Sequence, residues 1–87
     1  MMLKIIGLAA YDFASPLDGQ LVVEYDPSWH LPDGAYDGGK LITTPDPAKA
    51  RQFINAAEAM EYWRQSYGLR EDGKPNRPLT AYSVEVV

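Results

Sequence analysis

Asn55-Ala-Ala-Glu-Ala-Met-Glu-Tyr-Trp-Arg-Gln-Ser-Tyr67 is the stretch that decides the fold, because it carries the long helical pattern of this chain. Asn55 is a favourable N-cap residue, and Glu58 follows it at the spacing of a capping box. Ile54 and Ala59 then occupy the two positions of a hydrophobic staple. The apolar residues recur at helical spacing and form one stripe: Ala56, Ala59, Met60, Trp63 and Tyr67. The sequence predicts a helix over residues 55–67, stopped by Gly68, that must pack on a sheet because it is too short to be stable alone.

The segments around this helix have the two-residue alternation of strands. Residues 3–13 carry charges at Lys4 and Asp12 alone, so we expect a central strand that is buried on much of both faces. Residues 20–25 follow after a short turn, which predicts a hairpin with Leu21, Val23 and Tyr25 facing inward. Residues 41–44 are expected to form a short edge strand. Residues 79–87 are expected to form the last strand and to pair beside the first, which is too apolar to be an edge.

The resulting element order is β-β-(β)-α-β. It predicts an α+β fold, a small three- to four-stranded antiparallel sheet with one main helix packed on one face, and a single domain over residues 1–87. Between the third strand and the helix, Asp46-Pro47 has the pattern that opens a short helical turn. Phe53 is expected to enter the core just before the helix begins.

The composition excludes several kinds of chemistry. The chain has no cysteine, and His30 is its one histidine, so disulfides, a catalytic thiolate and His- or Cys-rich metal sites are excluded. No phosphate-binding or dinucleotide-binding motif is present, and Asp33 and Asp37 lack the spacing of a calcium loop. We therefore expect no cofactor and no dedicated metal site. No apolar run reaches the length of a membrane span, and residues 1–10 resemble a strand more than a secretory signal, so we expect a cytosolic protein of the host cell.

The formal net charge of −4 is unevenly distributed along the chain. Residues 1–39 contain one basic side chain, Lys4, against six acidic ones. This half of the chain argues against binding to a nucleic-acid duplex and is compatible with a basic partner. Acidic loops that keep a small protein soluble are the simpler explanation of the same asymmetry.

Residues 26–39, here called the acidic loop, contain prolines and glycines that prevent regular structure, and a loop of this length is often functional. We expect its candidate partner-binding residues to be Asp26, Trp29, His30, Asp33, Tyr36 and Asp37. Trp29 has two interpretations, a lid folded over the sheet edge or an aromatic anchor for a partner. His30 could alternatively act as a general base oriented by Asp26 or Asp33. A small basic patch near the C-terminal connection is a further candidate, formed by Arg64, Arg70, Lys74 and Arg77.

Residues 25–87 resemble a group of small proteins encoded by bacteriophages, prophages and bacterial mobile elements. The resemblance rests on Tyr25-Asp-Pro27, Asp37-Gly-Gly39, Thr44-Pro-Asp-Pro-Ala-Lys-Ala50, Arg51-Gln-Phe53 and Trp63-Arg64. Its most specific part is Asp72-Gly-Lys-Pro-Asn-Arg-Pro-Leu-Thr-Ala-Tyr-Ser-Val-Glu-Val86. The resemblance implies a phage-related setting and brings no activity or site residues with it.

Together these patterns favour a non-enzymatic phage or prophage accessory protein that binds a host or phage protein through the acidic loop and the neighbouring sheet surface. An inhibitor of host defence, similar in kind to an anti-CRISPR protein, is one specific version. A small ligand-binding domain or enzyme that uses His30 is the alternative. Weak nucleic-acid binding through Arg64, Arg70, Lys74 and Arg77 is a third hypothesis. No motif specifies the partner or the oligomeric state.

Overall fold

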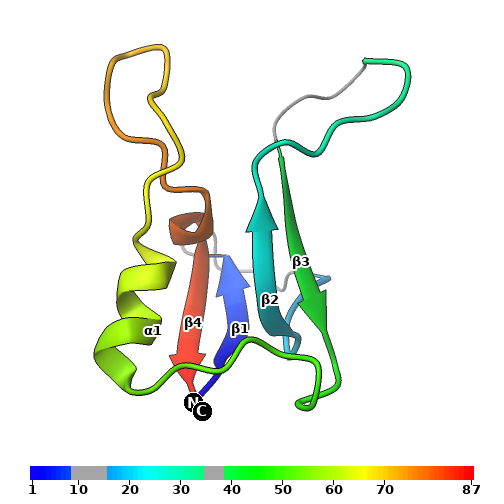
Figure 1. The fold of residues 1–87 in the computed structure, drawn as a ribbon, viewed down its shortest axis with the longest axis vertical. Helices are drawn as coiled ribbons and strands as arrows, with labels where there is room; N and C mark the ends of the chain where they lie inside the picture. The colour runs from blue at the N-terminus through cyan, green and yellow to red at the C-terminus, as the bar shows by residue number, and fades with distance from the viewer. Residues whose placement is uncertain (9–15, 35–38) are drawn as a thin grey trace.

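The computed structural model describes residues 1–8, 16–34 and 39–87. The elements in chain order are β1 (Leu3–Leu8), β2 (Leu21–Asp26), β3 (Lys40–Thr44), α1 (Ala56–Trp63), the 3₁₀ helix η1 (Pro78–Ala81) and β4 (Tyr82–Val86). The strands form one antiparallel sheet in the order β3-β2-β1-β4, and α1 lies on the side of β4 (Figure 1). The predicted α+β fold is therefore confirmed, including the central first strand, the third strand at an edge and the last strand beside the first.

The sheet consists of two well-paired ribbons with a short junction between them. β1 and β4 pair along their whole length, and so do β2 and β3. β1 meets β2 at the register pair of Lys4 and Leu21, where the amide of Ile5 donates to the carbonyl of Gln20 at 2.9 Å. Figure 1 shows that the two long segments beyond the strands, the one after α1 and the one after β2, spread apart at one end of the molecule.

The first strand is more exposed than predicted. β1 spans Leu3–Leu8, and residues 9–13 of the expected strand lie outside the described residues. Leu3 and Ile5 are fully buried on the face that carries the helix. Ile6, on the opposite face, is 52% exposed. The prediction of burial on both faces is wrong at this position, since the helix covers one face of the sheet.

A β-bulge changes which residues of β2 face the core. The pairing of β2 with β3 shifts register between Val22 and Glu24. Val22 is 1% exposed and belongs to the core cluster, and Tyr25 packs against the same cluster. The extra residue of a bulge reverses the alternation, so an inward position before it is followed by another three residues later. Leu21 is also buried, at 7% exposed. The predicted inward set of Leu21, Val23 and Tyr25 therefore contains two residues that are buried or packed on the core, Leu21 and Tyr25, and is wrong in omitting Val22.

The core cluster collects one or two residues from each part of the chain: Leu3, Ile5, Val22, Phe53, Ala59 and Leu79. Phe53 is 6% exposed, as predicted. Two backbone hydrogen bonds with Met1 hold it in place. The amide of Phe53 donates to the carbonyl of Met1 at 2.7 Å, and the terminal nitrogen of Met1 donates to the carbonyl of Phe53 at 3.0 Å. The turn predicted at Asp46 is present, since its carboxylate accepts from the amide of Ala48 at 2.9 Å. The segment between β3 and α1 thus delivers an aromatic ring to the core.

The N-terminus of α1 follows the local chemistry of its sequence in part. The side-chain oxygen of Asn55 accepts from the amide of Glu58 at 2.9 Å, which confirms the predicted N-cap. The Glu58 carboxylate accepts in return from the amide of Ile54 at 3.1 Å, one residue before the position of a standard capping box. The Ile54 side chain is 87% exposed. The predicted hydrophobic staple is therefore wrong.

The helix α1 is shorter than predicted. It ends at Trp63, with Arg64 as its C-cap, and not at Tyr67. Ala59 is buried, while Met60 and Trp63 pack against the core as predicted. The indole nitrogen of Trp63 donates to the carbonyl of Tyr82 at 3.0 Å and so ties the helix to the start of β4. Tyr67 lies beyond the helix and also packs against the core.

Residues 67–76, here called the hairpin arm, form a two-stranded projection in place of the expected polar connection. The amide of Tyr67 donates to the carbonyl of Asn76 at 2.7 Å, and the amide of Asn76 donates to the carbonyl of Gly68 at 2.9 Å. Nearer the tip, the amide of Arg70 donates to the carbonyl of Lys74 at 2.8 Å. The hairpin arm and the acidic loop project from the same end of the molecule (Figure 1).

Candidate functional site: a tyrosine-lined cleft between two projections

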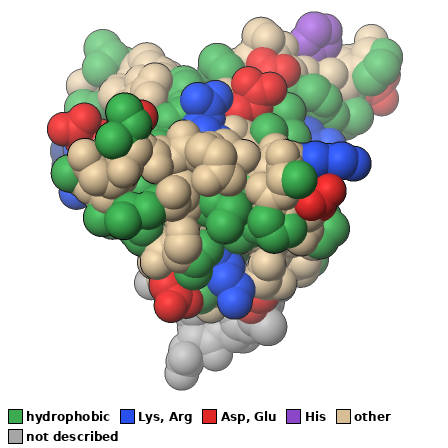
Figure 2. All heavy atoms as spheres, turned by 60° about the horizontal axis from the view of Figure 1, so that its bottom comes forward, with side chains coloured by type: hydrophobic (Ala, Val, Ile, Leu, Met, Phe, Trp, Pro, Cys, Tyr) green, Lys and Arg blue, Asp and Glu red, His purple; other side chains and the backbone are tan. Residues whose placement is uncertain are grey.

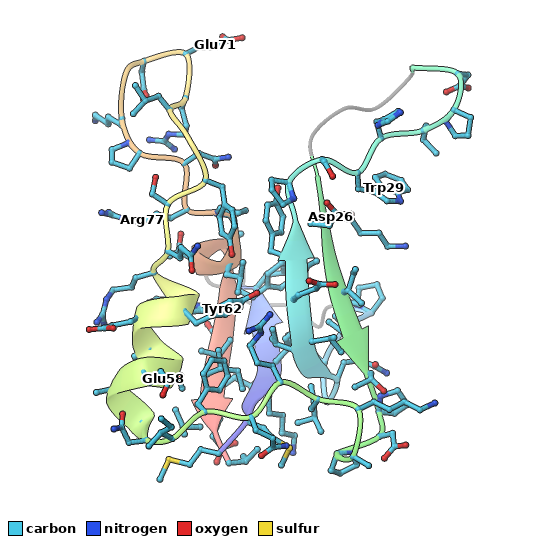
Figure 3. All side chains as sticks on the ribbon, viewed as in Figure 1. Asp26, Trp29, Glu58, Tyr62, Glu71 and Arg77 are labelled. Atoms are coloured by element: carbon cyan, nitrogen blue, oxygen red, sulfur yellow. The ribbon has the colours of Figure 1, made fainter. Side chains whose placement is uncertain are left out.

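The acidic loop begins with a turn built by Asp26. Its Oδ1 accepts from the backbone amide of Ser28 at 3.0 Å and from the Ser28 hydroxyl at 2.7 Å. These hydrogen bonds, the side-chain one foremost, hold the pKa of Asp26 below its usual value. Asp26 is therefore a constant negative charge at neutral pH, located where β2 ends and the loop begins (Figure 3).

Trp29 lies against the start of β3. Its ring is partly buried, the Nζ of Lys40 lies 5.3 Å from the ring centroid, and its carbonyl accepts from the amide of Gly39 at 3.2 Å. A cation over an indole face is attracted by the ring quadrupole. These contacts support a structural role for Trp29, and the exposed part of the ring is still available to a partner.

The remaining candidates of the acidic loop are more exposed. The Nδ1 of His30 lies 3.1 Å from the carbonyl oxygen of Ser28, while the Asp26 carboxylate is engaged by the same serine. His30 and Asp26 thus both contact Ser28, and the orientation of His30 by Asp26 or Asp33 stays a prediction. Asp33 is exposed. Tyr36 and Asp37 lie outside the described residues.

No group of three or more His, Cys, Asp or Glu side chains able to hold a metal ion occurs in residues 1–8, 16–34 and 39–87. Over the same ranges, no helix is long and apolar enough to cross a membrane.

The four basic candidates are exposed, and one of them pairs with an acidic neighbour. Arg70 and Lys74 share the hairpin arm, where the Arg70 guanidinium pairs with the Asp72 carboxylate at 3.4 Å. Arg64 is at the C-terminus of α1 and Arg77 at the base of the arm. Figure 2 shows basic and acidic side chains interspersed over the face in view. This arrangement gives no continuous basic surface there for a phosphate backbone.

A cluster of aromatic side chains connects the two ribbons, and sequence analysis missed its central member. The hydroxyl of Tyr62 accepts from the backbone amide of Tyr25 at 3.1 Å. The rings of Tyr25 and Tyr67 are 4.7 Å apart, and those of Tyr62 and Phe53 are 5.6 Å apart. Arg51 places its guanidinium 4.7 Å from the centroid of the Tyr62 ring and donates from Nε to the carbonyl of Val23 at 2.9 Å. Through this tyrosine cluster, α1 and the hairpin arm both contact β2.

Tyr67 is partly buried within this cluster, and its surroundings solvate a charge less well than water does. Burial, followed by the hydrogen bond to Tyr62, raises the pKa of Tyr67 from 10.0 to about 12. Both effects disfavour the phenolate of Tyr67. A negative charge is poorly solvated at this position, and the hydrogen bond with Tyr62 stabilises the neutral phenol. Tyr67 is therefore a neutral, fixed side chain at physiological pH.

A cleft of about 240 Å³ lies between the bases of the two projections. Residues from the ends of β2 and β3 and from the segment around η1 line it: Tyr25, Gly39, Leu41, Asn76, Pro78, Leu79, Ala81 and Tyr82. Two tyrosines and four aliphatic or proline residues make up most of this lining. None of the expected partner-binding residues that the structure describes belongs to it; Asp26 follows Tyr25 in the chain, but successive side chains of a strand point to opposite faces.

Gly39 keeps the cleft open and its wall in place. Its φ of +81° is a conformation that other residues adopt only under strain. A Cβ atom at this position would lie 2.8 Å from the Cζ of Tyr25 and 2.9 Å from the carbonyl oxygen of Asp26. The absence of a side chain thus allows the hydroxyl end of the Tyr25 ring to approach the backbone at Gly39, just before β3.

The fold and the cleft define a small α+β domain with a tyrosine-lined recess between two projecting loops. Comparison of the chain with protein-family models, with curated proteins and with solved structures finds no match. A signal for it was present in the sequence, since the chain has six tyrosines, and Tyr25, Tyr62, Tyr67 and Tyr82 form the cluster and the cleft.

Proposed function

We propose that this protein is a non-enzymatic interaction protein that holds a segment of a partner protein in the tyrosine-lined cleft. The observation that carries the proposal is the location of the cleft between the acidic loop and the hairpin arm, with Tyr25 and Tyr82 in its lining. Tyrosines supply large, rigid contact surfaces and are enriched among the residues that dominate binding energy at protein interfaces. The expected interface on the acidic loop is thereby extended to include β4 and the segment before it.

Two features of the rim support a protein partner. The projections carry exposed leucines, with Leu31 36% exposed and Leu69 75% exposed. Charged residues of both signs surround them, including Asp33 on the loop and the Arg70–Asp72 pair on the arm. Aromatic residues are enriched at protein–protein interfaces, and the rim of such an interface is polar.

A phage or prophage accessory role belongs to the same proposal and is supported by the resemblance of residues 72–86. An inhibitor of host defence would fit an acidic protein of this size, because such a protein can occupy a basic surface of a defence enzyme. Expression of the chain in a bacterium that resists a phage by CRISPR immunity should then restore plaque formation. Unchanged resistance in hosts with different defence systems would remove the defence-inhibitor version and leave the interaction proposal to the next test.

Site-specific photo-crosslinking in cells tests the interaction directly. A photoreactive p-benzoyl-phenylalanine replaces Ala81, which is exposed in the cleft lining, and in a matched control replaces Ala57, which is exposed on α1. We expect a discrete protein adduct from position 81 and a different, weaker pattern from position 57. Identical patterns from the two positions, or no adduct at position 81, would contradict the proposed function.

A further inference from the structure

The sheet has two edge strands, and they differ in their surroundings. β4 forms one edge, where the carbonyl of Tyr82 accepts from the indole nitrogen of Trp63 on α1 at 3.0 Å. β3 forms the other edge, at the end of the sheet away from α1 (Figure 1). An edge strand presents a row of backbone donors and acceptors to which another strand can pair. The question is therefore which strand fits the edge at β3.

The direction of the backbone groups of β3 follows from Tyr25. The Tyr25 amide donates to the Tyr62 hydroxyl at 3.1 Å and so points away from β3. Its cross-strand neighbour Leu41 therefore belongs to a pair without mutual hydrogen bonds, and the amide and carbonyl of Leu41 point outward from the sheet. Thr43 lies two residues further on and points the same way. In the part of the chain that the structure describes, no hydrogen bond reaches these outward groups.

A second copy of β3, antiparallel to the first, matches these groups in one register. With a two-fold axis at Ile42, Leu41 of each copy faces Thr43 of the other, and each of these pairs exchanges two hydrogen bonds. A register centred on Thr43 would place Leu41 opposite Pro45, which has no amide hydrogen. A register centred on Leu41 would place Thr43 opposite Gly39, whose amide already donates to the Trp29 carbonyl at 3.2 Å.

The side chains of β3 fit the same register. Ile42 of each copy lies opposite Ile42 of the other, which forms an apolar pair at the axis. Lys40 lies opposite Thr44 of the second copy, so that the cation does not face its equivalent. The strand begins with Lys40 and is followed by Asp46, and antiparallel pairing brings the basic start of one copy to the acidic end of the other. This complementarity of charge favours a second copy as the occupant.

We infer that the edge of β3 pairs with β3 of a second copy of this chain, which joins the two sheets into one continuous sheet with four strands from each copy. The interface is isologous and closed, since each copy uses its β3 edge once. The two-fold axis of such a pair is perpendicular to the sheet, so both clefts open on the same face of the dimer. This inference goes beyond the proposed function and does not depend on it.

The concentration dependence of the oligomeric state tests the inference on the intact chain. Few residues meet at this edge, so we expect a weak dimer whose population rises from about 10 µM to about 1 mM protein in sedimentation velocity. Amide hydrogen exchange of the ¹⁵N-labelled protein locates the interface. The amides of Leu41 and Thr43 should exchange more slowly at the high concentration, while those of Val84 and Val86 at the β4 edge should be unchanged.

Variants of two residues assign the contact to β3. T43P removes an outward amide without removing a hydrogen bond between β2 and β3, and T43V keeps the amide as its control. T43P should weaken dimerisation at least about 10-fold, because each copy loses one donor at the interface, and T43V should dimerise like the wild type. I42K places two cations opposite each other at the axis and should also weaken the dimer, whereas I42T should weaken it less.

The outcomes decide the inference without reference to the cleft. A protein that sediments as a monomer over the whole range would overturn it, as would slowed exchange at Val84 and Val86 in place of Leu41 and Thr43. A folded T43P protein that dimerises like T43V would also overturn it. If T43P does not give a cooperative unfolding transition, the comparison of I42K with I42T decides, and equal dimerisation of these two variants contradicts the pairing at β3. The photo-crosslinking result at Ala81 is independent of each of these measurements.

Discussion

The hydroxyl of Tyr62 accepts a hydrogen bond from the backbone amide of Tyr25 at 3.1 Å, and this contact joins α1 to β2. The same Tyr62 ring lies under the guanidinium of Arg51, which also holds the carbonyl of Val23. One side chain of the helix thus fixes the strand that provides Tyr25 to the cleft. The first prediction concerns this hydroxyl.

Y62F leaves the Tyr25 amide without its acceptor while keeping the aromatic ring. A buried amide that loses its hydrogen bond costs about 1–3 kcal/mol. Because this pair is partly buried, we expect a loss of unfolding free energy of about 1 kcal/mol. Urea denaturation followed by tryptophan fluorescence measures it. E61Q, the exposed neighbour on α1, is the control and should stay within about 0.5 kcal/mol of the wild type. A Y62F protein as stable as E61Q would contradict the role of the Tyr25 contact.

G39A tests the packing of the Tyr25 ring, and G73A provides a matched control. Gly39 and Gly73 have nearly the same φ, +81° and +82°, so Ala costs a similar backbone strain of about 1 kcal/mol at both positions. An added Cβ at Gly73 meets no atom within 4 Å, whereas at Gly39 it meets Tyr25 and Asp26. We therefore expect G39A to be clearly less stable than G73A and to show chemical-shift changes around Tyr25. Equal unfolding free energies for the two variants would show that the close approach is absent.

Tyr67 makes the stability of the protein sensitive to alkaline pH. Its pKa of about 12 in the folded protein lies above the ordinary 10.0, so folding favours the protonated phenol. The associated stabilisation is fully present below about pH 10 and is lost as the pH rises toward about 12. The unfolding free energy of the wild type should fall over this window more steeply than that of Y67F. Parallel pH profiles for the two proteins would indicate that Tyr67 ionises as freely as in water.

The N-cap of α1 is expected to contribute measurably because the helix has eight residues. N55A removes the acceptor for the Glu58 amide and should lower the unfolding free energy by about 0.5–2 kcal/mol, whereas N55D should retain most of the stability. Chemical denaturation of the three proteins decides this. If N55D loses as much stability as N55A, the effect comes from another property of the asparagine.

The elements that were predictable from the sequence depend on local chemistry. Asn55 followed by Glu58 marks the start of a helix whatever it packs on, and the alternation around Leu3 and Ile5 identifies a strand. The end of the helix was not predictable in this way. Tyr67 keeps helical spacing in the sequence, but its amide is taken by Asn76, a residue of the hairpin arm.

The site was harder to predict because it depends on pairs of distant residues. Tyr62 lies beside the apolar stripe of α1, and its role follows from the Tyr25 backbone, 37 positions away in the sequence. The bulge at Val22–Glu24 leaves no sequence pattern that separates it from regular alternation. The acidic loop drew attention through its length and composition, while the cleft arises from Tyr25, Leu41 and Tyr82, which meet only after the strands have paired.

The pairing of β1 with β4 has a consequence for how the chain folds. Met2 and Val87 exchange backbone hydrogen bonds of 2.8 and 2.9 Å, so the centre of the sheet joins the two ends of the described chain. Such a contact joins residues far apart in the sequence and carries a large entropic cost before it gains any stabilisation. The β2–β3 ribbon, by contrast, is local in sequence and can form early. Refolding should therefore be limited by capture of the last strand, and a ribosome must release most of this chain before its sheet can close.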